Sequence, residues 1–361
     1  MTSSPVNSNP VLVPKPQARA SKKENLTTVF FGLWLIFGFL IDGYAHGNLV
    51  ESLESFFTPW HAILYSGFLA AALWTIWMVY RRLRQGWQGL SAIPIGYELG
   101  LIGAFIFGFG GIADLIWHST FGIEIGIDAL RSPSHILLFI GAILLITAPL
   151  RAAWHDPASQ YAPSFLEFLP NLFVIFSCFC FSSLMNLHIW GLISLPDSTS
   201  NLSALVPSQN PAVLYALNSF IDAGILFTNA AIMFTILFIL QRWRTPFGTY
   251  GIVLGLSTFV LVIIVDNNLM PRVYLAALAG IIIDSLILTL KPSLTRLLEL
   301  RIFSALAPIV IWGTHFMAVH ITGGLGISPE LWTGILTMTA LSGLALSLLV
   351  AMPKPKNLLE T

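Results

Sequence analysis

Long apolar segments with almost no charges limit what this chain can fold into. A helix needs about 20 apolar residues to cross the hydrocarbon core of a bilayer. Segments of this kind recur near 27–45, 60–80, 94–118, 134–152, 166–189, 212–241, 246–265, 271–290, 302–320 and 330–351. Only 9% of the 361 residues are charged, against about 25% in soluble domains. The sequence therefore predicts an all-α, polytopic integral membrane protein with about ten transmembrane helices.

The distribution of Lys and Arg predicts how the chain is oriented, because cytoplasmic loops carry most of these residues. With ten spans, all Lys and Arg residues except Arg131 and Arg272 fall on one side. We therefore predict that both termini are cytoplasmic and that the protein lies in a bacterial inner membrane. Residues 1–26, which are polar and rich in Pro and Ser, are predicted to form a disordered cytoplasmic tail. A single helical domain over 27–352 and a second cytoplasmic tail over 353–361 follow.

Prolines mark the second helix of each predicted hairpin. The five outward loops end in Pro59, Pro133, Pro211, Pro271 and Pro329. Proline suits the first turn of a helix, since its missing N–H would have no intrahelical partner there. Four of these prolines follow the good N-cap residues Thr58, Ser132, Asn210 and Ser328. The pattern predicts five helical hairpins whose connecting loops face outward.

A polar motif is written twice, once in each of the first two hairpins. The first copy reads Asp42-x3-His46, then Glu54-x4-Pro59-x-His61-x2-Leu64-Tyr65-x-Gly67. The second copy reads Asp114-x3-His118, then Asp128-x4-Pro133-x-His135-x2-Leu138-Phe139-x-Gly141. Agreement in residue type and order predicts an internal repeat over 27–152.

The spacing of this motif brings three polar side chains of each copy together. Asp and His at positions i and i+4 share one helical face, and the later His stands in the first turn of the returning helix. Imidazole and carboxylate without thiolate suit zinc, copper or non-haem iron. The sequence therefore predicts a divalent or copper metal ion at the outer face. The candidate ligands are Asp42, His46, His61, Asp114, His118 and His135.

The same spacing resembles the copper-binding pattern in the C subunit of the membrane-bound methane and ammonia monooxygenases. The resemblance covers only this motif, and here the gap before the last His is longer and the motif is doubled. It implies copper-ligand roles for Asp42, His46 and His61 in the first copy. In the second copy it implies the same roles for Asp114, His118 and His135. The resemblance concerns the site and not the ancestry of the chain.

Other polar residues near the motif have alternative interpretations. Glu54 and Asp128, in the outer loops, are candidate acid–base groups, although a loop carboxylate is ordinarily solvated. Arg131 would hold an anionic group or, more simply, form an ion pair with Asp128. His320 could join the cluster from a later hairpin. Asp222 lies deeper in its predicted span, where an acid marks a pathway or anchors neighbouring helices.

These features leave three functions open. The leading hypothesis is a metal-dependent oxidoreductase or hydrolase that acts on a lipid or a small apolar substrate, with Glu54 or Asp128 as base for a metal-bound water. The first alternative is a proton-coupled or metal transporter, whose route would continue inward through the deep acids Glu98, Asp222 and Asp284. The second is a non-catalytic assembly or sensor protein, whose cluster binds nothing. Membrane lipids are the expected partners, and the net charge of zero gives no reason to expect nucleic acid.

Overall fold

The computed structural model describes residues 17–49, 56–122, 132–156, 211–265, 270–322, 325 and 328–351. The helices are α1 (Lys22–Asn48), α2 (Pro59–Arg84), the short 3-10 helix η2 (Gly89–Ala92), α3 (Glu98–Phe121), α4 (Pro133–Ile146), α5 (Ala148–Trp154), α8 (Pro211–Arg242), α9 (Thr249–Val265), α10 (Met270–Leu290), α11 (Leu297–Thr322) and α12 (Pro329–Val350). Eight helical segments are long and apolar enough to cross a membrane. The predicted all-α, multi-pass membrane class is therefore confirmed for the described residues.

The predicted spans coincide with these helices except for the span at 166–189, which lies outside the described residues. Helices α4 and α5 together form one candidate span over Pro133–Trp154, and α9 contributes a shorter apolar segment, Thr249–Phe259. Helices α2, α4, α8 and α12 each begin at one of the predicted prolines. The total of ten spans in five hairpins stays a prediction.

Helix α1 begins earlier than the sequence analysis places it. The Ser21 hydroxyl accepts a hydrogen bond from the Glu24 backbone N–H, and the Glu24 carboxylate accepts one from the Ser21 N–H. This capping box satisfies two N–H groups that would otherwise lack partners at the helix start. Buried Glu24 also forms an ion pair with buried Arg82, at 3.0 Å. Polar residues 22–26, which the sequence predicts to lie in the tail, therefore belong to the first turns of the helix.

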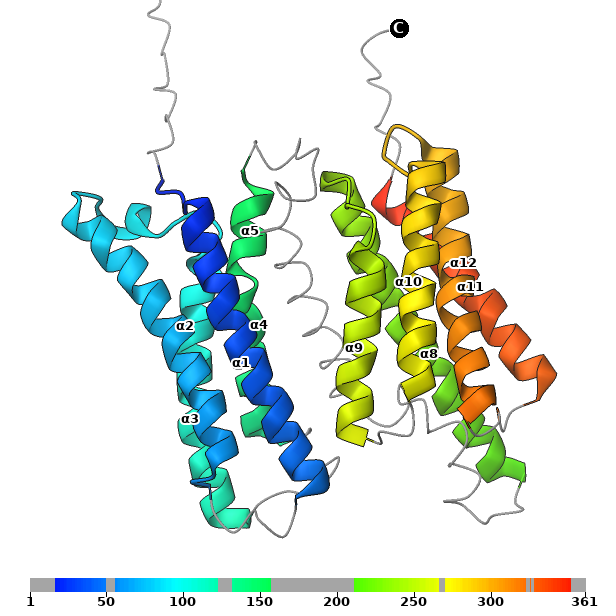
Figure 1. Cartoon of the computed structure of the whole chain (residues 1–361), viewed down its shortest axis with the longest axis horizontal. Helices are drawn as coiled ribbons and strands as arrows, with labels where there is room; N and C mark the ends of the chain where they lie inside the picture. The colour runs from blue at the N-terminus through cyan, green and yellow to red at the C-terminus, as the bar shows by residue number, and fades with distance from the viewer. Residues whose placement is uncertain are drawn as a thin grey trace, which may run out of the picture.

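The helices form two groups, α1–α5 and α8–α12 (Figure 1). Helix α1 packs on α2 and α3 packs on α4, while in the other group α9 packs on α10 and α11 packs on α12. Contacts between α1 and α9 join the two groups. Two clusters of buried apolar side chains form the largest cores. One lies within α1–α4, and the other lies mainly within α8–α12 and includes Ala153 of α5.

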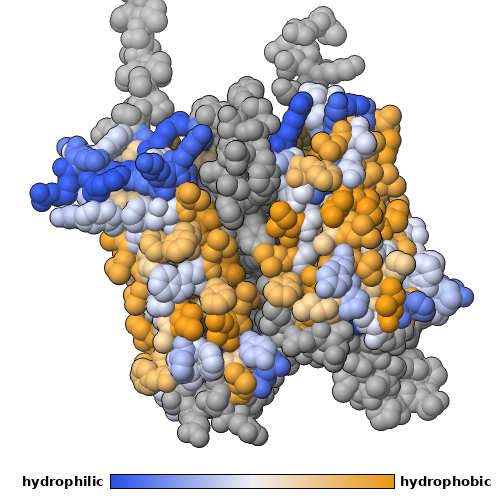
Figure 2. Space-filling view, in the orientation of Figure 1, coloured by the Kyte–Doolittle hydropathy of each residue, from blue (hydrophilic) through white to orange (hydrophobic). Residues whose placement is uncertain are grey.

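One end of the molecule is rich in basic residues, and we call it the basic end. Helix α1 begins there, and helices α2, α8, α10 and α12 end there (Figure 1). The basic residues in or beside these helix ends are Lys22, Lys23, Arg81, Arg82, Arg84, Arg242 and Lys291. Figure 2 shows a hydrophilic surface at this end and an apolar band across the middle of the molecule. We call the opposite end, where α1 and α3 end and α2 and α4 begin, the histidine end.

Two glycines of the repeated motif lie where the helices of each hairpin approach each other closely. A Cβ atom added at Gly67 on α2 would lie 2.8 Å from the Leu35 Cα on α1, and one added at Gly141 on α4 would lie 2.5 Å from the Phe107 backbone N on α3. Leu35 and Phe107 precede Asp42 and Asp114 by the same number of residues. The hairpins therefore share this local geometry, and the internal repeat itself stays a prediction.

Candidate metal centre

The first hairpin places three polar side chains at the histidine end. Asp42 and His46 lie one turn apart near the end of α1, and His61 lies in the first turn of α2. His61 Nε2 lies 3.4 Å from Asp42 Oδ1, and His46 Nε2 lies 3.9 Å from Asp42 Oδ2. The Thr58 hydroxyl caps α2 by accepting from the His61 N–H. His61 Nδ1 lies 2.6 Å from the Phe56 carbonyl, which can only accept, so Nδ1 carries the proton. In the neutral ring, Nε2 therefore keeps its lone pair and can bind a metal.

The second hairpin repeats this arrangement. Asp114 Oδ1 lies 3.4 Å from His118 Nε2 on α3 and 3.1 Å from His135 Nε2 at the start of α4. The other ring nitrogens face the protein, since His118 Nδ1 lies 3.3 Å from the Gly122 carbonyl and His135 Nδ1 lies 2.8 Å from the Ser132 hydroxyl. Ser132 is the N-cap residue of α4, as predicted, but its hydroxyl makes no capping bond to the backbone. It orients His135 instead.

The two triads form one cluster. The His46 ring centroid lies 6.1 Å from those of His118 and His135, and the His61 and His118 centroids are 5.8 Å apart. Two sets of three ligand atoms, each set within 4.8 Å, could hold a metal ion. The first set comes from Asp42, His46 and His61, and the second from His61, Asp114 and His118. The hairpins therefore meet at His61, and the candidate ligands of both copies lie together.

All six side chains of the cluster are buried. Asp114 has no exposed surface, and Asp42 is the most exposed residue of the six at 8%. A buried carboxylate is costly unless it is hydrogen-bonded, paired with a cation or bound to a metal. Two buried carboxylates surrounded by four imidazoles therefore have the composition of a metal centre.

Asp114 accepts side-chain hydrogen bonds of a kind that Asp42 Oδ1 does not accept from the described residues. The Tyr65 hydroxyl, from the first hairpin, donates to Asp114 Oδ2 at 2.9 Å, and the Ser134 hydroxyl donates to Asp114 Oδ1 at 3.0 Å. Among the described residues, Asp42 Oδ1 accepts no hydrogen bond. Tyr65 and Phe139 occupy matching positions of the two motif copies, and the sequence predicted no role at the site for Tyr65 or Ser134. One signal in the sequence could have indicated the role of Tyr65: its phenolic hydroxyl is the group that Phe139, its match in the other copy, lacks.

Tyr65→Phe is expected to lower the metal affinity of the cluster about 10- to 100-fold, the usual effect of losing a partner that orients a metal ligand. The phenyl ring keeps the packing while the hydroxyl that fixes Asp114 Oδ2 is lost. Competition with a chromophoric chelator would measure the affinity, with Tyr80→Phe, a half-exposed tyrosine on α2, as the control. An affinity equal to that of the wild type would mean that Tyr65 contributes only packing.

The remaining predicted site residues lie elsewhere or outside the described part of the chain. Glu54, Asp128 and Arg131 belong to segments outside the described residues. Asp222 lies in α8, and its side chain is not described. His320 lies near the end of α11, in the other helix group, and is exposed. No contact among the described residues joins His320 to the cluster.

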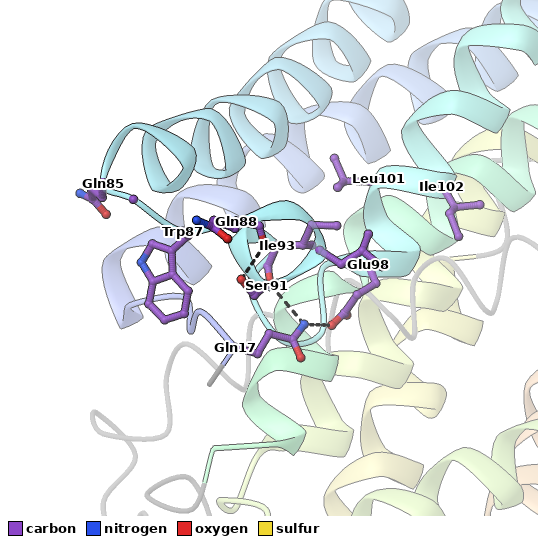
Figure 3. A pocket seen from close by; sticks show the side chains of 11 residues that line it. Gln17, Gln85, Trp87, Gln88, Ser91, Ile93, Glu98, Leu101 and Ile102 are labelled. Carbon is purple, nitrogen blue, oxygen red and sulfur yellow. Dashed lines mark hydrogen bonds between the residues drawn. The ribbon is translucent and has the colours of Figure 1, made fainter. Parts of the chain in front are cut away.

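Two deep acids predicted to continue a transport route bind backbone amides instead. Glu98 Oε2 accepts from the Gly96 N–H at 2.8 Å, and its Oε1 accepts from the Gln17 side chain at 2.5 Å, in a pocket at the basic end (Figure 3). Asp284 on α10 accepts from the N–H groups of Tyr250 and Gly251, both at 3.1 Å, in the first turn of α9. Each acid therefore satisfies N–H groups at the start of a helix.

A surface pocket opens beside the cluster. It is lined by Phe56, Phe57, Thr58, Pro59, His61, Ala62 and Tyr65. Most of this lining is apolar, and His61 and Tyr65 both belong to the site. The pocket therefore gives a small apolar group a place next to the candidate metal ligands.

No protein-family model, curated protein or solved structure matches this chain. A helical membrane fold alone does not determine an activity, so the chemistry of the site must indicate the function. The fold and the site together define a multi-pass membrane-type protein with buried Asp and His groups that could hold a metal ion.

Proposed function

We propose that the protein is an integral membrane metalloenzyme that oxidises or hydrolyses a lipid or a small apolar substrate at a metal centre between its first two hairpins. The observation that carries the proposal is the convergence of four buried histidines, through their Nε2 atoms, around two buried carboxylates. Three of the histidines face a protein oxygen with Nδ1, the arrangement that fixes a metal-binding imidazole.

The distances within the cluster favour metal binding over a polar network with only a structural role. His46 Nε2 and Asp42 Oδ2 are 3.9 Å apart, too far for a hydrogen bond, and Asp42 Oδ1 accepts none from the described residues. Ligands on opposite sides of an ion are about 4 Å apart, since each lies about 2.0–2.2 Å from it. The carboxylate-to-Nε2 distances in the described cluster are 3.1, 3.4, 3.4 and 3.9 Å, each short enough for both atoms to bind one ion.

The bound ion would supply a Lewis acid, a redox centre or an activated water, depending on its identity. Imidazole and carboxylate ligands suit zinc, copper or non-haem iron. The chain itself would orient the ligands through Tyr65, Ser132 and Ser134, and would admit the substrate beside Phe56 and Phe57. Glu54 and Asp128 are proposed as acid–base groups, and Arg131 as an anion-binding group. The basic end is proposed to face the cytoplasm, which would place the site at the outer face.

The deep acids weaken the alternative of a transporter. A route from the cluster into the membrane would need polar groups that face water or one another. The carboxylate oxygens of Glu98 and Asp284 instead accept hydrogen bonds from backbone amides at helix starts. This pattern is typical of structural anchors, and it favours a closed site.

Metal analysis of the purified protein tests the proposal. We expect near-stoichiometric copper, iron or zinc by mass spectrometry in mild detergent, and its loss from a His46→Ala, His118→Ala double variant. His155→Ala, which changes an exposed histidine beside α5 at the basic end of the molecule, should keep the metal. If the double variant does not unfold cooperatively, the same positions changed to Gln provide a variant of more similar size. Absence of metal in the wild type, even after reconstitution with each of the three metals, would overturn the proposal.

A further inference from the structure

We propose that the cluster holds two metal ions of unequal affinity, with the tighter one bound at Asp114. This inference rests on the proposed function, because it specifies the stoichiometry of the same site. It is carried by two sets of ligand atoms that share His61, and by hydrogen bonds to Asp114 that have no counterpart at Asp42 Oδ1 among the described residues.

The number of ligands exceeds what one ion uses. A catalytic zinc ion takes three protein ligands and keeps a further position open, and the cluster offers six side chains. The sequence divides them into two triads, and each triad combines one carboxylate with two imidazoles. Three ligands for each ion leave open positions at both ions, which is the composition of a two-metal site.

His61 determines how the two ions are placed relative to each other. Its Nε2 atom lies 3.4 Å from Asp42 Oδ1, and the same residue belongs to the set formed with Asp114 and His118. Because His61 belongs to both sets, the two groups of ligand atoms adjoin at this residue. The ions would therefore be adjacent, at the separation of about 3.5–4 Å that two-metal sites show. His61 also lines the apolar pocket, so a substrate bound there would lie next to this junction.

The surroundings of the two carboxylates differ, and this difference predicts unequal affinity. Tyr65 and Ser134 both donate to Asp114 and hold its oxygens in place before a metal arrives. Phe139 and Trp60 occupy the corresponding positions of the other copy, and neither carries a hydroxyl. An ion at Asp42 must therefore order its own ligand, which lowers the affinity.

Two measurements test the inference. The metal-free protein is titrated with Zn²⁺ in a calorimeter, and the number of metal ions per chain is measured at saturation. We expect two ions per chain, bound in two steps whose dissociation constants differ at least 10-fold, the lower end of the effect of removing an orienting partner. His46→Ala should keep the tighter step and lose the weaker one. Tyr65→Phe should weaken the tighter step, and it is the second test should the histidine variants fail to fold.

Paramagnetic resonance of the Cu²⁺-loaded protein gives a second readout. With one equivalent we expect the signal of an isolated ion, and with two equivalents a loss or broadening of that signal through coupling between neighbouring ions. Saturation at one ion per chain, or loss of all metal from His46→Ala, would overturn the two-ion inference while leaving the proposed function standing. Two steps of equal affinity would overturn the inequality. A wild-type protein that binds no metal would instead overturn the proposed function.

Discussion

In the metal-free protein, Asp114→Asn is expected to lower the free energy of unfolding by about 3–5 kcal/mol, the range for removing one partner of a buried charged network. Asp114 is fully buried, and it accepts hydrogen bonds from Tyr65 and Ser134. Its Oδ1 atom also lies 3.1 Å from His135 Nε2. The amide of Asn has one acceptor oxygen where the carboxylate has two, so at least one buried donor loses its partner.

Asp42→Asn is the matched variant, and we expect it to change the free energy of unfolding by less than about 1 kcal/mol. Asp42 has two histidine neighbours at 3.4 and 3.9 Å, and its Oδ1 atom accepts no hydrogen bond from the described residues. A buried carboxylate with so few partners contributes little to stability, as expected for a group retained for function. Asp42→Asn should still lose the more weakly bound ion, and Asp114→Asn should lose the tighter one.

Denaturant unfolding in detergent, with a chelator present throughout, would compare the two variants with the wild type. The chelator is needed because bound metal stabilises the folded state. Without it, the measured loss of stability would combine the loss of metal binding with the loss of hydrogen bonds to the carboxylate. Equal destabilisation by the two substitutions would contradict the assigned difference between the carboxylates. Destabilisation by Asp42→Asn but not by Asp114→Asn would mean that Asp42 is the carboxylate that contributes to stability.

The sequence predicted the parts of the site that depend on local geometry. Asp114 and His118 share a helical face because they are four residues apart, and the structure places Asp114 Oδ1 within 3.4 Å of His118 Nε2. Pro133 marks the first residue of α4, which brings His135 to the same carboxylate. These relations follow from helix periodicity and from the chemistry of the first helical turn.

The parts that depend on tertiary contacts could not be predicted. The hydrogen bond from Tyr65 to Asp114 joins two hairpins, and no periodicity within either hairpin indicates it. The partners of the deep acids could not be predicted either, because the position of an acid along a span does not indicate which groups of other helices lie beside it. Asp284 was interpreted as part of a pathway because it lies in an apolar segment, but it accepts from the amides of Tyr250 and Gly251 on another helix.

The two motif glycines connect the packing of the hairpins to metal binding. Gly67→Ala would place a Cβ 2.8 Å from the Leu35 Cα, and Gly141→Ala would place one 2.5 Å from the Phe107 backbone N. Real side chains do not approach backbone atoms so closely, so the two helices of each hairpin must move apart. Overpacking of this kind typically costs about 1–3 kcal/mol.

We expect each of these glycine variants to lose metal affinity as well as stability. The ligands of each triad come from both helices of a hairpin, and metal–ligand distances tolerate only about 0.2 Å of change. A shift that makes room for a Cβ would therefore separate Asp42 from His61 in Gly67→Ala, and Asp114 from His135 in Gly141→Ala. Thermal unfolding and chelator competition would measure the two effects on the same samples. The control is Gly313→Ala on α11, where an added Cβ meets no heavy atom of the described chain within 4 Å, so stability should be unchanged or higher. Wild-type affinity in both motif variants would show that the close approach of the helices serves packing alone, and that the ligand positions are set by the helix ends.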